Sequence, residues 1–239
     1  MNLEEIIYKR QSIRTYESNP LRDDVLNDLR DFIDNVPTLN PDIEWTYDIV
    51  DSSKVKTLQN FHAPHHLLVF SENRDNYLEN IGFIFQQVDL YLQANGFGSC
   101  WVGAGGPKDY EIPSNQEFVI LIAFGKAKGK LYRDRSQFKR KSLDKISDYE
   151  DERLIPAQLA PSAGNSQGWY FRHNDDGTYD LFRNKRKLVL KKSWDAWNYL
   201  DMGIALAHLY VSNRDSFKFY VKEDAEDLKN KIYIGSFEI

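Results

Sequence analysis

The sequence predicts an α+β fold in which a mixed sheet is flanked by helices and two related halves follow one another along the chain. Helical and strand-like hydrophobic periods alternate, and the alternation starts again after a polar stretch near residue 148. A chain of 239 residues can bury a core as one large domain or as two packed halves. We expect the first half to span residues 1–147 and the second half to span residues 148–239.

The expected helices of the first half follow amphipathic spacing. Apolar residues recur on one face of residues 2–10, of residues 22–33 and of residues 77–94. The third and longest of these helices ends at Asn95 and Gly96, as a left-handed C-cap requires. We therefore expect it to be a central packing element.

Three segments of the first half indicate strands. Residues 45–50 alternate between apolar and polar side chains, whereas residues 67–70 and 118–124 are continuous apolar runs bounded by turn residues. The basic segment 126–145 is too polar for a core, and residues 148–152 are expected to form a solvated linker.

Two patterns recur in the same order in both halves. The first is a helix followed by Pro, Asn and Trp, and the second is a helix that opens with Tyr, Leu, an acidic residue and a nearby Gly. The members are Pro37, Asn40 and Trp45 against Pro161, Asn165 and Trp169, and Tyr77, Leu78, Glu79 and Gly82 against Tyr199, Leu200, Asp201 and Gly203. Such spacings also arise by chance in mixed proteins, but their order favours an internal duplication.

Composition and charge restrict the class of function. The net charge of -5 and the pI near 5.6 give the chain no electrostatic footprint for nucleic acid or for an anionic membrane. The single cysteine, Cys100, excludes an internal disulfide framework and a multi-cysteine metal site, which is consistent with a reducing compartment. Acidic residues stand where a secretion signal would carry positive charge, and no apolar run approaches the roughly 18 residues of a membrane span. We expect a cytoplasmic protein whose partner is a small molecule.

The segment after the first helix offers two guanidiniums and a hydroxyl. It reads Arg10, Gln11, Ser12, Ile13 and Arg14. Alternate residues of an extended segment project to one side, so Arg10, Ser12 and Arg14 can converge on one anionic ligand such as a phosphate. The same pattern also occurs at solvated strand edges, where it binds nothing.

A second candidate segment is the loop at residues 159–169, which has small and hydrogen-bonding residues and no apolar periodicity. Ser162, Asn165 and Gln167 carry donors and acceptors without charge, which suits the polar edge of a planar heterocycle. The structural alternative is a helix-ending turn in which Ser and Asn act as caps.

Two further patterns do not support a site. Three histidines lie close together around Pro64, but this proline breaks the helical spacing that a metal-binding pair would use, so we expect a strand entry. The glycines at residues 96–106 match neither the dinucleotide fingerprint nor the P-loop.

Taken together, these motifs resemble the nitroreductase family of FMN-dependent flavoproteins. The resemblance rests on Arg-x-Ser-x-Arg at residues 10–14, on Ala-Pro-Ser-Ala-Gly-Asn-Ser-Gln-x-Trp at residues 160–169, and on Gly-Phe-Gly-Ser-Cys-Trp at residues 96–101. The basic segment 138–146 is similar to the family's terminal Arg-Lys segment. In ordinary members the first two motifs lie in the same half, whereas here they lie in different halves. The chain therefore resembles the fused-half TM nitroreductase type, in which one polypeptide forms a pseudo-dimer.

This resemblance implies an NAD(P)H-dependent flavin oxidoreductase. Electrons would pass from NADH or NADPH through bound FMN to a nitroaromatic, a quinone or a similar acceptor, with one FMN per chain. Because the family's dimer would be mimicked within the chain, the resemblance implies a monomer. The alternative is a non-catalytic flavin-binding protein, which would be a sensor, a carrier or a degenerate homologue.

The resemblance also assigns roles to residues. Arg14 would lie beside the pyrimidine side of the flavin and act as the catalytic residue, because a fixed guanidinium stabilises the negative charge of the reduced ring. Arg10 and Ser12 would bind the phosphate and the ribityl chain. The expected cofactor-binding residues are Arg10, Gln11, Ser12, Arg14, Gly103, Ala104, Gly105, Arg140, Lys141, Pro161, Ser162, Ala163, Asn165 and Gln167, and no metal ligand is expected.

Overall fold

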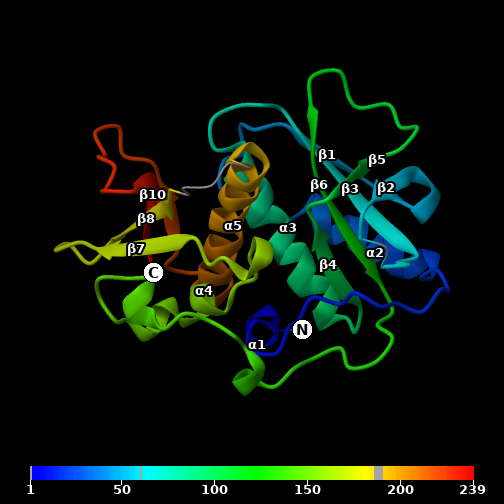
Figure 1. Cartoon of the computed structure of the whole chain (residues 1–239), viewed down its shortest axis with the longest axis horizontal. Helices are drawn as coiled ribbons and strands as arrows, with labels where there is room; N and C mark the ends of the chain where they lie inside the picture. The colour runs from blue at the N-terminus through cyan, green and yellow to red at the C-terminus, as the bar shows by residue number, and fades with distance from the viewer. Residues whose placement is uncertain (1, 60, 186–190) are drawn as a thin grey trace. The chain divides into compact units, whose positions relative to one another are not determined.

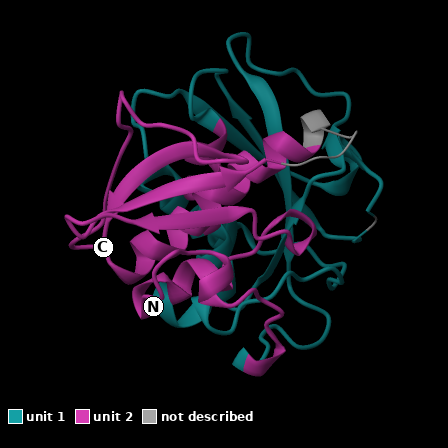
Figure 2. Cartoon of the chain, turned by 60° about the vertical axis from the view of Figure 1, so that its left-hand side comes forward, with its two compact units in different colours: residues 1–77, 87–135 teal, residues 78–86, 136–239 magenta. Residues whose placement is uncertain are grey.

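The computed structural model describes residues 2–59, 61–185 and 191–239. Its contacts divide the chain into two compact units, which Figure 2 shows in different colours. Unit 1 comprises Met1–Tyr77 and Gln87–Arg135, and unit 2 comprises Leu78–Gln86 and Ser136–Ile239. The expected halves are continuous stretches of the chain. The compact units are not continuous, because Leu78–Gln86 of the long helix is grouped with unit 2.

Unit 1 contains a four-stranded sheet in the order β1-β3-β6-β4 (Figure 1). Its strands are β1 (Trp45–Val50), β3 (His65–Ser71), β4 (Gly98–Val102) and β6 (Glu117–Gly125). The helices α1 (Leu3–Ile7) and α2 (Asp23–Asp34) precede the sheet in the chain, and α3 (Tyr77–Ala94) follows β3. A short pair, β2 (Val55–Thr57) with β5 (Gly105–Pro107), completes the strands of this unit.

The core of unit 1 lies against the central strand β3, in which every residue is buried. One face of the sheet carries a cluster that includes Leu68, Leu121 and Ile13. Tyr16 joins the same cluster, and its hydroxyl lies 2.6 Å from the carbonyl oxygen of Ile13 and 3.1 Å from that of Ala123. Burial raises the pKa of Tyr16, so the phenol stays neutral and ties the N-terminal segment to the sheet.

Unit 2 contains a second four-stranded sheet, in the order β7-β8-β10-β9. Its strands are β7 (Trp169–His173), β8 (Tyr179–Asn184), β9 (Lys218–Tyr220) and β10 (Lys231–Glu238). The helix α4 (Ile155–Leu159) precedes this sheet in the chain, and α5 (Lys191–Ser212) follows β8. Short 3-10 turns stand at η1 (Ser52–Lys54), η2 (Arg135–Gln137), η3 (Leu143–Lys145), η4 (Glu152–Leu154) and η5 (Ala163–Asn165).

The two sheets have the same topology. In each, the first two strands pair, a long helix follows the second strand, and the last strand inserts between the second and the third. Each sheet also has a β-bulge at the same place in the pairing of its two central strands. The bulged residues are Val119 on β6 and Ile234 on β10. Bulges are retained within families, so this shared position indicates one common pattern.

The first half of α3 crosses the middle of α5 in direct backbone contact within unit 2. The motif at Tyr199 was expected to open this helix, but α5 begins earlier, at Lys191. A Cβ atom at Gly82 would lie 2.2 Å from the carbonyl oxygen of Leu200, and one at Gly203 would lie 1.9 Å from that of Glu79. The contact is reciprocal, because the residue three positions before each glycine faces the other glycine. Reciprocal pairing of this kind is typical of two-fold symmetric interfaces.

Among the helices of the described residues, none combines the length and apolar character needed to cross a membrane.

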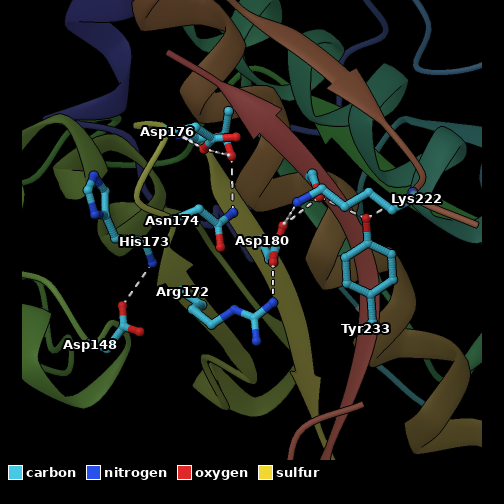
Figure 3. Close-up of polar contacts among 10 residues, drawn as sticks. Asp148, Arg172, His173, Asn174, Asp176, Asp180, Lys222 and Tyr233 are labelled. Carbon is cyan, nitrogen blue, oxygen red and sulfur yellow. Dashed lines mark hydrogen bonds and ion pairs between the residues drawn. The ribbon is translucent and has the colours of Figure 1, made fainter. Parts of the chain in front are cut away.

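Polar residues replace an apolar cross-strand pair in unit 2. Leu68 pairs with Leu121 in unit 1, two residues past the bulge, and the matching pair in unit 2 is Asp180 with Ser236. The buried carboxylate of Asp180 accepts bonds from Ser236 Oγ at 2.6 Å, and from Lys222 Nζ at 2.9 Å and Arg172 Nη2 at 2.5 Å, as Figure 3 shows for the last two. Burial alone would raise the pKa of Asp180, but these bonds outweigh it and lower the pKa to about 2.

The α+β fold class expected from the sequence is confirmed, and two expected segments have the observed bounds, namely residues 45–50 and 77–94. Within each sheet, however, all strand pairs of the described residues are antiparallel, which differs from the mixed sheet that was expected. The reason is topological. The strands that precede and follow each long helix are not adjacent, because β6 lies between β3 and β4 and β10 lies between β8 and β9, and each inserted strand runs antiparallel to both neighbours. The first helix ends at Ile7 rather than at residue 10, since the chain then turns to run beside β4.

Candidate functional site

The N-terminal strip, defined as residues 10–14, runs beside β4 in unit 1. The backbone N–H of Ile13 donates to the carbonyl of Ser99 at 2.9 Å, and the N–H of Gln11 donates to Gln93 Oε1 at 3.1 Å. These bonds tie the strip to the start of β4 and to the end of α3.

Arg10 lies inside unit 1 and is only 1% exposed. Its Nε atom lies 2.9 Å from Oδ2 of Asp89, a carboxylate of α3 with no exposed surface. The other oxygen of Asp89 accepts bonds from Ser99 Oγ at 2.6 Å and Gln93 Nε2 at 3.3 Å. Arg10 also donates to Ser12 Oγ at 3.4 Å, so the structure brings these two strip residues together. The charge of Arg10 is therefore compensated within the protein, and its role toward a phosphate stays a prediction.

Arg14 is the exposed cation of the strip. Burial raises the pKa of the neighbouring Cys100 thiol, whereas the charges of Arg14 and Arg10 oppose that rise. Cys100 is thus a packed thiol, and Arg14 lies within electrostatic reach of it.

A further cation next to the strip has no signal in the sequence motifs. Arg133 donates from Nε to the carbonyl of Arg10 at 2.9 Å. Burial and the charge of Arg10 lower the pKa of Arg133 to about 10. Because repulsion between like charges contributes to that change, an anion at this place would stabilise both guanidiniums.

The glycine turn, defined as residues 103–105, follows β4 in the same unit. The carbonyl oxygen of Ala104 accepts bonds from the N–H of Leu58 at 3.0 Å and from Thr57 Oγ1 at 3.1 Å. Gly105 pairs with Thr57 between β5 and β2. The turn that was expected near the flavin is therefore held by the β2–β5 pair.

The amide loop, defined as residues 161–168, belongs to unit 2 and contains three residues with left-handed backbone. The φ angles are 57° at Gly164, 56° at Asn165 and 47° at Gln167. A left-handed conformation is uncommon outside glycine and is retained where the surroundings enforce it, often at functional sites. One enforcing bond is donated by the N–H of Gln167 to Ser162 Oγ at 2.9 Å.

The basic pair Arg140 and Lys141 lies directly on the amide loop. Arg140 Nη1 donates to Asn165 Oδ1 at 2.8 Å, and the backbone N–H of Lys141 donates to Gln167 Oε1 at 2.6 Å. Lys141 Nζ donates to the carbonyls of Ser166 and Gln167, each at 2.9 Å. Four residues expected to bind the cofactor, two from each segment, are thus brought together within one unit.

Two buried side chains of α5 that the sequence analysis did not assign to the site also contact this loop. The N–H of Ala163 donates to Asp201 Oδ1 at 2.9 Å, and Ser166 Oγ donates to Asp201 Oδ2 at 3.3 Å. Ser166 Oγ also lies 3.4 Å from Asn198 Oδ1. Pro161, the remaining loop residue expected to bind, is partly buried at the start of the loop.

The histidine cluster forms a strand entry, as expected. His65 and His66 are the first residues of β3, and His65 Nε2 accepts a bond from the N–H of Leu21 at 2.8 Å. Burial lowers the pKa of His66 to about 4, so its imidazole stays neutral inside the sheet.

Comparison with known proteins gives the family. A family model described as "Putative TM nitroreductase" matches residues 2–213. The crystal structure of the tm1586 protein of Thermotoga maritima has a TM-score of 0.64 and 20% identity, and the alignment covers 99% of this chain and 92% of that one. A nitroreductase family protein of Clostridium difficile 630 has a TM-score of 0.52 and 20% identity, over 63% of this chain and 99% of that one. No curated protein matches the sequence. Since the family model spans most of the chain, the protein belongs to the TM nitroreductase family and has its α+β fold.

Proposed function

We propose that this chain is an FMN-dependent oxidoreductase that passes electrons from NADH or NADPH to a nitroaromatic, a quinone or a similar small electrophile. One observation carries the proposal, namely the amide loop of unit 2. There Asn165 and Gln167 are held in left-handed turns and are bonded to Arg140 and Lys141. Membership of a nitroreductase family supports the same activity.

The donor set of the amide loop fits flavin mononucleotide. Side-chain amides and hydroxyls both donate and accept, as the polar edge of the flavin ring requires. Arg140 and Lys141 supply the cations that a phosphate prefers. FMN, when bound, supplies the redox chemistry, and the protein supplies orientation and charge.

The residues of unit 1 keep the roles that the family resemblance implies. Arg14 is the exposed guanidinium that would stabilise negative charge on the reduced ring. Arg10, Gln11 and Ser12 are assigned to the phosphate and ribityl groups, and the backbone of the glycine turn is assigned to the reactive edge of the ring. Arg133 joins this set because it donates to the carbonyl of Arg10 at 2.9 Å. Its positive charge repels that of Arg10, so an anion nearby would be favoured.

We also propose that the chain arose by internal duplication. The shared strand order, the shared bulge and the reciprocal crossing of Gly82 with Leu200 and of Gly203 with Glu79 support this origin. The Arg-x-Ser-x-Arg motif of the N-terminal strip and the Ala-Pro-Ser-Ala-Gly-Asn-Ser-Gln-x-Trp motif of the amide loop each occur once in the sequence. One FMN per chain and a monomeric protein follow from the proposal.

Purification followed by anaerobic reduction tests the activity. We expect a yellow protein whose colour bleaches with NADH or NADPH and returns when a quinone or nitroaromatic is added. A yellow protein that neither nucleotide bleaches would favour the alternative, a flavin-binding protein without turnover. A colourless protein that rejects added FMN would exclude both.

A further inference from the structure

The carboxylate of Asp201 joins the two ends of the left-handed turn in the amide loop. It is 2% exposed and lies on α5. One oxygen binds the N–H of Ala163 at 2.9 Å and the other binds the hydroxyl of Ser166 at 3.3 Å. Between these two residues stand Gly164 and Asn165, with φ angles of 57° and 56°. A single side chain therefore binds the residues on either side of Gly164 and Asn165, which are two of the three left-handed residues of the loop.

Other residues on the same face of α5 complete the support of the loop. Asn198 lies one turn before Asp201, is 1% exposed, and its Oδ1 lies 3.4 Å from Ser166 Oγ. Asn198 also donates to the carbonyl of Trp194, one turn earlier. The ring of Trp194 packs on Gly164, since a Cβ atom added there would lie 3.2 Å from Trp194 Cη2. Spacings of four and three residues place these side chains on one face of the helix.

The conformation that Asp201 holds determines where the ligand-binding groups of the loop stand. With the turn fixed, Asn165 accepts its bond from Arg140, and Gln167 accepts its bond from Lys141. Without it, the left-handed backbone of Asn165 would lose a charge-assisted support that offsets its conformational cost. Binding groups that are already ordered before a ligand arrives increase its affinity.

We propose that Asp201 is a positioning residue of the flavin site, which preorganises the amide loop without contributing a bond to the cofactor. The inference rests on the proposed function, because it concerns how that same site is prepared. No family motif at residues 10–14, 96–101 or 160–169 includes Asp201.

Three variants of the full chain test this role. Asp201→Leu removes both acceptor oxygens, and Asp201→Asn retains one of them, which can still accept from Ala163. The matched control is Asp175→Asn, because Asp175 is an exposed carboxylate of the same unit, between β7 and β8. Hydrogen exchange of the Ala163 amide is measured in the flavin-free protein, and FMN affinity is measured by titration.

We expect Asp201→Leu to increase the exchange rate of the Ala163 amide and the Kd for FMN by about tenfold or more, since a hydrogen bond to a charged group is lost. Asp201→Asn should give intermediate values, and Asp175→Asn should match the wild type in both measurements. Wild-type values for a folded Asp201→Leu protein would overturn the proposal. If that variant does not fold, wild-type exchange and affinity in Asp201→Asn would overturn it.

The two measurements separate this inference from the proposed function. A wild-type protein that rejects FMN refutes the proposed function and, with it, the positioning of a flavin site. Exchange at Ala163 would still report whether Asp201 holds the loop. A wild-type protein that binds FMN, combined with unchanged variants, refutes the positioning role alone.

Discussion

Replacing Asp89 by asparagine removes the countercharge of a buried guanidinium. Arg10 is 1% exposed and Asp89 is fully buried, and their charged atoms lie 2.9 Å apart. The substituted amide would keep the shape of the side chain but leave Arg10 without a compensating charge. Breaking one partner of a buried ion pair costs about 3–5 kcal/mol of folding free energy. For a chain of this size that loss lowers Tm by roughly 6–20 °C.

Urea unfolding followed by tryptophan fluorescence measures this cost. The exposed Asp31 of α2 gives the control, and Asp31→Asn should change the free energy of unfolding by less than about 0.5 kcal/mol. The double variant Arg10→Met with Asp89→Asn should regain most of the loss, because methionine needs no countercharge and the amide oxygen can still accept from Ser99 and Gln93. A cost below about 1 kcal/mol for Asp89→Asn would refute the argument that Arg10 depends on this carboxylate.

Three further predictions follow from the contacts described above. Gly203→Ala should destabilise the protein by about 3 kcal/mol or more in urea unfolding, because its Cβ would overlap the carbonyl of Glu79; an unchanged midpoint would contradict the crossing. Asp180 has a folded-state pKa below its unfolded value of about 3.9, so it contributes about 2 kcal/mol above that pH, and this stability is lost as pH falls toward about 2. Acid titration of Asp180→Asn should lack that loss, and an identical acid limb would contradict it. Arg14→Ala should weaken FMN binding or slow flavin reduction by about tenfold, whereas the exposed Arg22→Ala should do neither; unchanged binding and reduction in Arg14→Ala would refute its role.

Much of the fold of unit 1 follows from its hydrophobic periodicity. The segments 45–50 and 77–94 have strong two- and 3.6-residue periods, and both elements have the expected bounds. The strands of unit 2 were not predicted, because polar residues occupy buried positions there. β8 carries Asp180 and Arg183 inside the sheet, each with a charged partner from another segment. The apolar pattern that identifies a buried strand is lost when charged residues are buried against countercharges from distant segments.

The candidate site divides in a similar way. Asn165 and Gln167 were identifiable, because their side chains belong to a local turn that the sequence spells out. Asp89, Arg133 and Asp201 were not. Asp89 and Arg133 contact the N-terminal strip and Asp201 contacts the amide loop, each from a separate segment, and acidic residues on helices are usually solvated. Their roles depend on tertiary contacts that no local spacing records.

The count of FMN molecules bound by the chain tests the central claim most directly. Flavin-free protein is titrated with FMN, and bound flavin is measured against protein concentration together with the molecular mass in solution. We expect one FMN per monomeric chain. No binding would contradict the flavin assignment, and two FMN per chain would contradict the proposal that one site remains after an internal duplication.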